Sequence, residues 1–250
     1  MDCVVLKNKI VEWIRDYYRT NNLKGAVLGV SGGKDSAVVA GLMSEAIGPE
    51  NVVGLTLPCH SRQMDADGAK LVADHFGFEL LNVDLTDVCD LFESNIDKLG
   101  DFTAEQRSDS SINLKPRLRM STVYYMAALL SKVKGGTYIV PGTSNACELY
   151  VGYFTKGGDS VFDIAPIYNL TVDEVIGVGE ALGVPEEVLY RVPDDGLSGK
   201  SDEEKMGVKY ADISSLIKGE EVDELEREKI EKLHAKTRHK FNKNDFQFER

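Results

Sequence analysis

The sequence has no apolar run near the ~20 residues of a membrane span, and its N-terminus lacks a signal-peptide pattern. Cysteine is scarce. The four cysteines form no CxxC pair, which argues against a disulfide framework, an iron–sulfur cluster or a zinc ribbon. Positive charge is also scarce: 29 Lys and Arg against 41 Asp and Glu give a net charge of −12. We therefore expect a cytoplasmic protein with no membrane or nucleic-acid partner, although a local basic pocket remains compatible with anionic small ligands.

What the sequence contains is the composition of an ordinary globular protein, 42% hydrophobic and 28% charged. No repeat, linker or low-complexity tract divides residues 1–250, so we expect a single domain. Short apolar runs alternate with amphipathic segments, which is typical of a doubly wound parallel sheet. Strands are expected at 25–30, 51–57, 78–85 and 137–143, with a further extended stretch at 159–167. Helices are expected at 4–19, 35–47, 64–76, 116–133, 171–183 and 221–240, with another ending near residue 99.

Two polar segments, residues 100–114 and 194–206, are expected to be mobile loops in the free protein. The helix that follows the first of them is predicted to begin at Pro116, since proline is tolerated in a first helical turn.

Three polar stretches follow strands and should meet at one edge of the sheet. They read "SGGKDS" after the first strand, "LPCHSRQ" after the second and "PGTSNACE" after the fourth. In a doubly wound fold, the ligand crevice lies off the carboxyl ends of the strands. The pattern therefore predicts a binding site at this edge.

The turn "GVSGGKDS" is suited to phosphate. Gly32 and Gly33 permit positive φ and a close approach of backbone N–H groups to anionic oxygens. The Walker pattern GxxxxGK[ST] and the dinucleotide fingerprint GxGxxG both fail here. Asp35 beside a phosphate cradle is unfavourable unless a cation lies between them, so its presence suggests a bound Mg²⁺.

SGGKDS resembles the SGGxDS loop of the PP-loop ATP pyrophosphatases, which cut ATP between the α and β phosphates. The stretch "GTSNACELYVGYFTKGGDSVFDIAPIYNL", together with "NLKPRLRM" and "KTRHK", resembles the signature of ammonia-dependent NAD synthetases. That resemblance implies a mostly parallel five-stranded sheet of the adenine nucleotide alpha hydrolase type. It also implies a homodimer and the reaction ATP + deamido-NAD⁺ + NH₃ → NAD⁺ + AMP + PPi, through an acyl-adenylate. Because the substrate's own carboxylate is the nucleophile, no Ser-His-Asp or Cys-His arrangement is required, and none is evident.

The resemblance also implies roles for individual residues. ATP would be bound by Gly29, Val30, Ser31, Gly32, Gly33, Lys34, Asp35, Ser36 and Thr143. Mg²⁺ would be held by Asp35 and Glu148. Deamido-NAD would be contacted by Arg117, Lys156, Asp163, His239 and Lys240.

Two positions depart from the family pattern. Val172 stands where many members have a lysine that contacts ATP, and Asp194 stands where many have Ser or Thr. Lys34 and Lys200 are candidates to supply the missing charge. Glutamine-using relatives carry an additional amidohydrolase domain, and we expect none here, so that free ammonia or ammonia from a separate protein is used.

Other interpretations stay open on the sequence alone. One is another PP-loop enzyme such as a tRNA thiolase, which the acidic charge and the missing CxxC disfavour. The other is a nucleotide-binding regulator without catalysis. Individual residues also have plain structural readings: Arg117 and Arg119 as a solvated helix face, Lys156 as a turn lysine, and His239 and Lys240 as favourable charge at a helix C-terminus.

Overall fold

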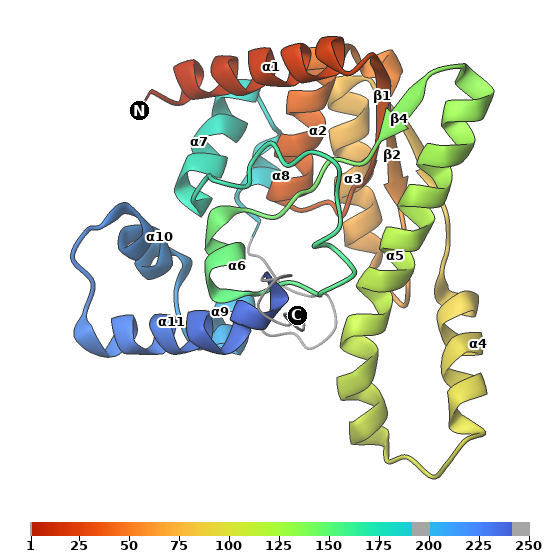
Figure 1. The fold of residues 1–250 in the computed structure, drawn as a ribbon, viewed down its shortest axis with the longest axis vertical. Helices are drawn as coiled ribbons and strands as arrows, with labels where there is room; N and C mark the ends of the chain where they lie inside the picture. The colour runs from red at the N-terminus through yellow and green to blue at the C-terminus, as the bar shows by residue number, and fades with distance from the viewer. Residues whose placement is uncertain (1, 192–200, 242–250) are drawn as a thin grey trace, which may run out of the picture.

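The computed structural model describes residues 2–191 and 201–241 (Figure 1). Asp194 and Lys200 lie outside the described residues, as does most of the segment 194–206. Within the described ranges, no helix has the length and hydropathy needed to cross a bilayer.

A parallel sheet lies at the centre of the fold, with strand order β3-β2-β1-β4. Its strands are β1 (Leu23–Gly29), β2 (Val52–Thr56), β3 (Glu79–Asn82) and β4 (Thr137–Ile139). The chain builds outward from β1 to β3 and then returns to pair β4 on the other side of β1. The strand order therefore reverses between β1 and β4, where doubly wound folds bind their ligands.

The doubly wound fold is confirmed, but the strand count of five is wrong for the described residues, where the sheet has four. The extended stretch expected at 159–167 contributes one isolated parallel bridge, between Pro141 and Ile164. Turns at residues 156–160 and 166–169 leave too little extended backbone between them for a ladder.

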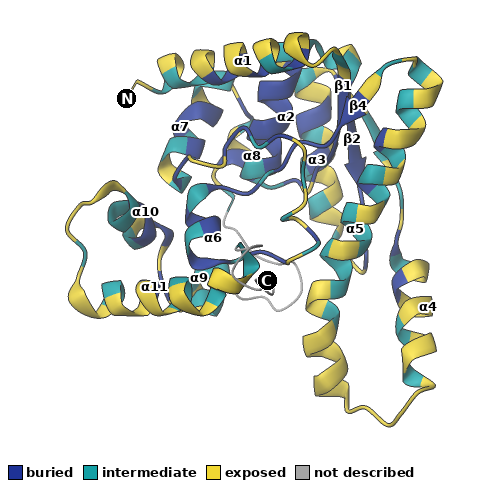
Figure 2. Cartoon of the chain, viewed as in Figure 1, coloured by how far each residue is buried: buried dark blue, intermediate teal, exposed yellow. Residues whose placement is uncertain are grey.

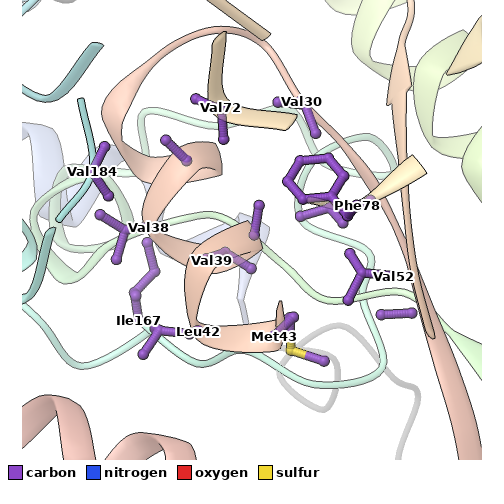
Figure 3. Packing of buried hydrophobic residues seen from close by; sticks show 14 of the residues in the cluster. Val30, Val38, Val39, Leu42, Met43, Val52, Val72, Phe78, Ile167 and Val184 are labelled. Atoms are coloured by element: carbon purple, nitrogen blue, oxygen red, sulfur yellow. The ribbon is translucent and has the colours of Figure 1, made fainter. Parts of the chain in front are cut away.

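Helices cover both faces of the sheet, because successive side chains of each strand point to opposite sides. Ala26 and Leu28 face a layer formed by α1 (Cys3–Thr20), α2 (Lys34–Ile47), α3 (Gln63–Phe76), α7 (Val172–Leu182) and α8 (Glu186–Leu189). Figure 3 shows this layer, with Val38, Val39 and Leu42 of α2 among its side chains. Val27 faces the opposite layer of α4 (Thr86–Asp97) and α5 (Ala104–Lys134).

The mobile loop expected at 100–114 is wrong over most of its length, because α5 begins at Ala104. A reciprocal capping box starts the helix: Gln106 N donates to Thr103 Oγ1, and Thr103 N donates to Gln106 Oε1. The added turns pack on α4 through an Arg107–Asp97 ion pair of 3.0 Å. Pro116 consequently lies inside the helix, not in its first turn. The first turns of α5 show no helical periodicity of apolar residues, because they contact one partner helix, α4, and need few apolar side chains to do so.

A third cluster forms beside the carboxyl edge of the sheet, from α6 (Ala146–Val151), α10 (Tyr210–Lys218) and α11 (Glu224–Thr237). The short elements η1 (Pro49–Asn51), α9 (Asp202–Met206) and η2 (Arg238–Lys240) complete the described chain. Gly152 ends α6 at φ +70°, and a Cβ there would lie 2.3 Å from Thr237 Cβ of α11. This close approach holds α11 beside α6 (Figure 1), and Lys240 of η2, which follows α11, lines the same cleft as the loop after β1.

Candidate active site at the carboxyl edge of the sheet

A cleft of about 710 Å³ opens at the carboxyl ends of β1, β2 and β4. Its lining includes Val30 after β1, Pro58 after β2 and Gly142 after β4. The predicted convergence of the three polar stretches is therefore confirmed. Of the predicted site residues, the cleft is lined by Gly29, Val30, Ser31, Gly33, Lys34, Asp35, Ser36, Thr143, Glu148 and Lys240.

Hydrogen bonds within the PP-loop hold it against the first turn of α2. Ser31 N donates to Ser36 Oγ at 3.2 Å, and Ser36 Oγ donates to Gly33 O at 3.0 Å. The two serine hydroxyls lie 3.1 Å apart. A rigid turn with hydroxyls and a helix N-terminus on one side is suited to anionic oxygens.

The two glycines of the loop have different roles, which corrects the prediction that both need positive φ. Gly32 has φ +76°, and a Cβ there would lie 2.4 Å from the backbone oxygen of Asp65 in α3. Gly33 has φ −101° and acts as the N-cap of α2, where a Cβ would meet no atom closer than 3.4 Å. Only Gly32 therefore requires glycine for its conformation.

A network of polar contacts joins the PP-loop to α6. Asn145 is the N-cap of α6, and its Oδ1 accepts from Cys147 N and Glu148 N. Its Nδ2 donates to Asp35 Oδ1 at 3.0 Å. Asn145 thereby places the carboxylate of Asp35, at the start of α2, beside that of Glu148, in the first turn of α6.

The electrostatics of this pair suit a hard cation. Burial raises the pKa of Glu148 well above its usual value, and the nearby Asp35 carboxylate raises it further. Two carboxylates held close together attract a divalent ion, and Mg²⁺ commonly binds one or two carboxylates together with substrate phosphates. Among the described residues, no group of three or more acidic, histidine or cysteine side chains forms a complete metal site. Asp35 and Glu148 therefore fit a metal that is shared with a bound triphosphate.

Lys240 also lines the cleft. Its Nζ donates to Gly152 O at 2.6 Å and to Phe154 O at 2.7 Å, and it lies 5.0 Å from the centroid of the Phe154 ring. These bonds join the C-terminal η2 to the turn after α6.

The other predicted deamido-NAD contacts do not line the cleft. Arg117 Nε donates to Lys156 O, and Lys156 Nζ donates to His239 O, both at 3.2 Å, so three of them form a chain next to Lys240. Asp163 lies apart from this chain. Its Oδ2 accepts from Val140 N at 2.8 Å and its Oδ1 from Tyr124 Oη at 3.2 Å, bonds that extend the end of β4.

The charged residues that line the cleft but received no site role from the sequence include Arg119, Asp159 and Arg191. Arg119 donates from Nε to Leu57 O at 3.0 Å and from Nη2 to Ser61 Oγ at 3.2 Å, so the reading of Arg119 as a solvated helix face is wrong. Residues two apart lie on different sides of a helix, so only one of Arg117 and Arg119 was able to face the cleft. The sequence carried no signal for which one.

Arg191 braces the PP-loop. Its Nη2 donates to Asp65 Oδ1 at 2.6 Å, and its Nη1 reaches Gly32 O at 3.4 Å. Asp159 accepts from Thr155 N at 2.7 Å, and burial raises its pKa. Asp159 stands in the "TKGGD" stretch, which was the one available signal for it.

The position that departs from the family pattern, Val172, packs in the apolar cluster of α6, α10 and α11. Tyr210 belongs to the same cluster, and the Nζ of Lys34 lies 5.5 Å from the centroid of its ring. One of the two lysines proposed to supply the missing charge is therefore close to this cluster.

Comparison with known proteins identifies the family. The family model described as NAD synthase matches residues 6–246. The NH(3)-dependent NAD(+) synthetase of Carboxydothermus hydrogenoformans is 39% identical over 235 residues, which cover 93% of this chain and 92% of that protein. The solved NMN synthetase from Francisella tularensis is similar with a TM-score of 0.86 and 32% identity, covering 97% of each chain. The NH3-dependent NAD synthetase from Campylobacter jejuni superposes with a TM-score of 0.76 and 25% identity, covering 99% of this chain and 100% of that one. The chain belongs to the NAD synthase family.

Proposed function

We propose that this chain converts deamido-NAD to NAD by way of an acyl-adenylate. The overall reaction uses ATP and ammonia, as expected of a member of the NAD synthase family with ammonia-dependent relatives along most of its length. The observation that carries the proposal is the cleft itself. It brings together the Gly29–Ser36 loop, the carboxylates of Asp35 and Glu148, and Lys240.

In the first step, a carboxylate oxygen of the nicotinate ring attacks the α-phosphorus of ATP, and pyrophosphate leaves. Ser31, Gly33 and Ser36 bind the departing pyrophosphate through hydroxyl and backbone N–H donors. Hydrogen bonds within the loop hold these groups at the N-terminus of α2. On binding, the Ser36 hydroxyl and the Gly33 N–H, which donate to Gly33 O and Ser31 Oγ, would exchange these acceptors for phosphate oxygens.

In the second step, ammonia attacks the activated carbonyl carbon, loses a proton, and AMP leaves. The chain's own part in both steps is to bring a triphosphate and a second pyrophosphate group together in spite of their mutual repulsion. Lys240 on the cleft wall, with Arg117, Lys156 and His239 beside it, binds the acceptor nucleotide. Asp163 is also proposed to contact the acceptor nucleotide. Its Oδ2 accepts from Val140 N, and this bond fixes the segment around Asp163 beside the end of β4.

Asp35 and Glu148 would hold Mg²⁺, which supplies positive charge to the phosphate oxygens of ATP. The support for this assignment is the donor set: two carboxylates, both near the PP-loop, with the pKa of Glu148 raised by burial and by Asp35.

The reaction is tested by incubating the protein with ATP, Mg²⁺, deamido-NAD and ammonium, and measuring NAD, AMP and pyrophosphate. Deamido-NAD labelled with ¹⁸O in its carboxylate separates the routes. Attack of the carboxylate on ATP transfers one ¹⁸O to AMP, whereas a route without the adenylate gives unlabelled AMP. Failure to form NAD with the folded, ATP-bound protein would refute the proposed function.

A mononucleotide is a second candidate acceptor. The observation that favours it is the higher TM-score with the NMN synthetase, 0.86, than with the Campylobacter NAD synthetase, 0.76. Nicotinic acid mononucleotide presents the same carboxylate and lacks the adenylate half of deamido-NAD. Running both acceptors in parallel and comparing kcat/KM decides between them.

We also propose that the chain acts as a homodimer in the cytoplasm, where ATP is available. The helices α4 and α5 project from the body of the molecule and carry exposed residues along most of their length (Figure 2). On α5, Tyr125, Leu129 and Val133 recur at four-residue spacing, and the side chain of Val133 is 73% exposed. An apolar stripe of this kind is typical of a surface that a second copy covers. Light scattering after chromatography should give twice the monomer mass, and Leu129→Glu should give a monomer.

A further inference from the structure

Lys34 is a buried cation paired with Asp35 of the proposed metal site. Lys34 is 6% exposed, its Nζ lies 2.9 Å from Asp35 Oδ2, and the same Nζ lies over the ring of Tyr210, 5.5 Å from its centroid. A lysine is rarely buried unless it is paired, because the loss of hydration must be offset by a partner charge. Lys34 therefore has an electrostatic role here beyond filling space.

Both oxygens of the Asp35 carboxylate are already engaged. Oδ1 accepts from Asn145 Nδ2 at 3.0 Å, and Oδ2 accepts from Lys34 Nζ at 2.9 Å. Asn145 is fixed, because its other side-chain atom caps α6. Lys34 ends a flexible four-carbon stem. Of the two donors, Lys34 is therefore the one that can move when a divalent ion approaches Asp35, and the two positive charges repel each other.

We propose that Lys34 is the resident counter-ion of the Asp35–Glu148 pair, and that it competes with the divalent metal for Asp35 Oδ2. The proposal rests on the metal site of the proposed function, and it adds that Lys34 controls how tightly this site binds the metal. Lys34 also lines the cleft beside Ser31 and Ser36. An ammonium displaced from Asp35 is thus positioned to donate to a phosphate oxygen of ATP, and one positive charge passes from the carboxylate to the nucleotide as the metal arrives.

The test measures binding of Mn²⁺ alone, by electron paramagnetic resonance of the free ion, without nucleotide. Lys34→Met removes the charge and keeps an unbranched side chain of similar length. Its affinity for Mn²⁺ should rise by about tenfold or more, since a unit charge near the ion is gone. Lys34→Arg keeps the charge and should remain near the wild-type affinity. The matched control is Lys7→Met: Lys7 is also well covered and ion-paired, to Glu45 at 2.6 Å, but it does not line the cleft, and its loss should leave Mn²⁺ binding unchanged.

The sign of the change decides the outcome. Equal or weaker Mn²⁺ binding by Lys34→Met, where the wild type binds the ion, overturns the counter-ion role and leaves the metal site standing. Mn²⁺ binding that Asp35→Asn does not alter overturns the metal site and this proposal together.

The wild-type protein supplies a second readout that needs no variant. Limited acetylation, followed by mass spectrometry of the peptide that contains Lys34, should increase when Mn²⁺ is added and fall again when ATP is added with it. Acetylation of Lys34 that does not respond to Mn²⁺ overturns the proposal even if Lys34→Met fails to fold.

Discussion

Replacing Gly32 with alanine should destabilise the protein much more than the same change at Gly33, one residue away. Gly32 has φ +76°, a left-handed conformation that costs a non-glycine residue about 1–2 kcal/mol. The added methyl would also lie 2.4 Å from Asp65 O and 3.1 Å from Ala69 N, both backbone atoms of α3. Backbone cannot rotate away as a side chain does, so either the PP-loop or α3 must shift.

The expected loss for Gly32→Ala is at least about 2 kcal/mol of unfolding free energy, made up of the conformational cost and the contact with α3. For a chain of this size, that corresponds to a fall in Tm of ~5 °C or more. Gly33→Ala is the matched control, because Gly33 has φ −101° and its nearest neighbour to a new methyl is the Ser31 hydroxyl at 3.4 Å. An N-cap glycine replaced by alanine should cost less than about 1 kcal/mol.

Urea unfolding followed by circular dichroism measures both variants under the same conditions. A change in midpoint without a change in slope reports stability alone. Equal losses for the two variants would refute the assignment of Gly32 as the strained position, because the argument depends on φ and on the approach of α3, which only Gly32 has.

Further predictions concern the acid pair, the C-terminal helix and the buried thiols. Asp35→Asn and Glu148→Gln should each abolish Mg²⁺-dependent formation of NAD, and retained turnover in both variants would rule out the metal assignment. The Tm should stay within a few degrees for Glu148→Gln and fall further for Asp35→Asn, which removes the charge paired with the buried Lys34. Gly152→Ala should raise the KM for the deamido substrate, because its methyl would lie 2.3 Å from Thr237 and push α11 and Lys240 away from the cleft. An unchanged KM would show that this contact does not hold η2 in place. Cys89 should resist iodoacetamide at pH 8 in the folded protein and react rapidly in urea. Burial, followed by the hydrogen bond and charge of Cys59, raises the pKa of its thiol to about 12, which suppresses the reactive thiolate, so fast alkylation of folded protein would contradict the packing described here.

Elements whose signals lie within a few neighbouring residues were predicted well. The strands expected at 25–30 and 51–57 correspond to β1 and β2, and the capping box of Thr171 and Glu174 opens α7 as expected. Buried parallel strands read as continuous apolar runs, and caps are set by residues three apart, so both are visible in a short window of sequence.

Elements that depend on a partner were predicted poorly. The first turns of α5 carry few apolar residues, because they contact one neighbouring helix through polar bonds such as Arg107 to Asp97. The stretch at 159–167 has strand-like residues, yet its bracing by Asp163 against Val140 yields a bridge and not a fifth strand. In both segments, the conformation follows from packing that no local pattern records.

The sequence by itself determined the layered parallel sheet, the edge at which its polar turns meet, and the family, because backbone preferences and motif spacings are properties of neighbouring residues. Only the tertiary structure decided which charged groups share the cleft. Asn145 reaches Asp35 across 110 positions of the chain, Arg119 faces the site where Arg117 does not, and Lys34 is buried against Tyr210. Such contacts depend on how helices distant in the sequence pack together. A small rotation of one helix about its axis would turn a different residue toward the site.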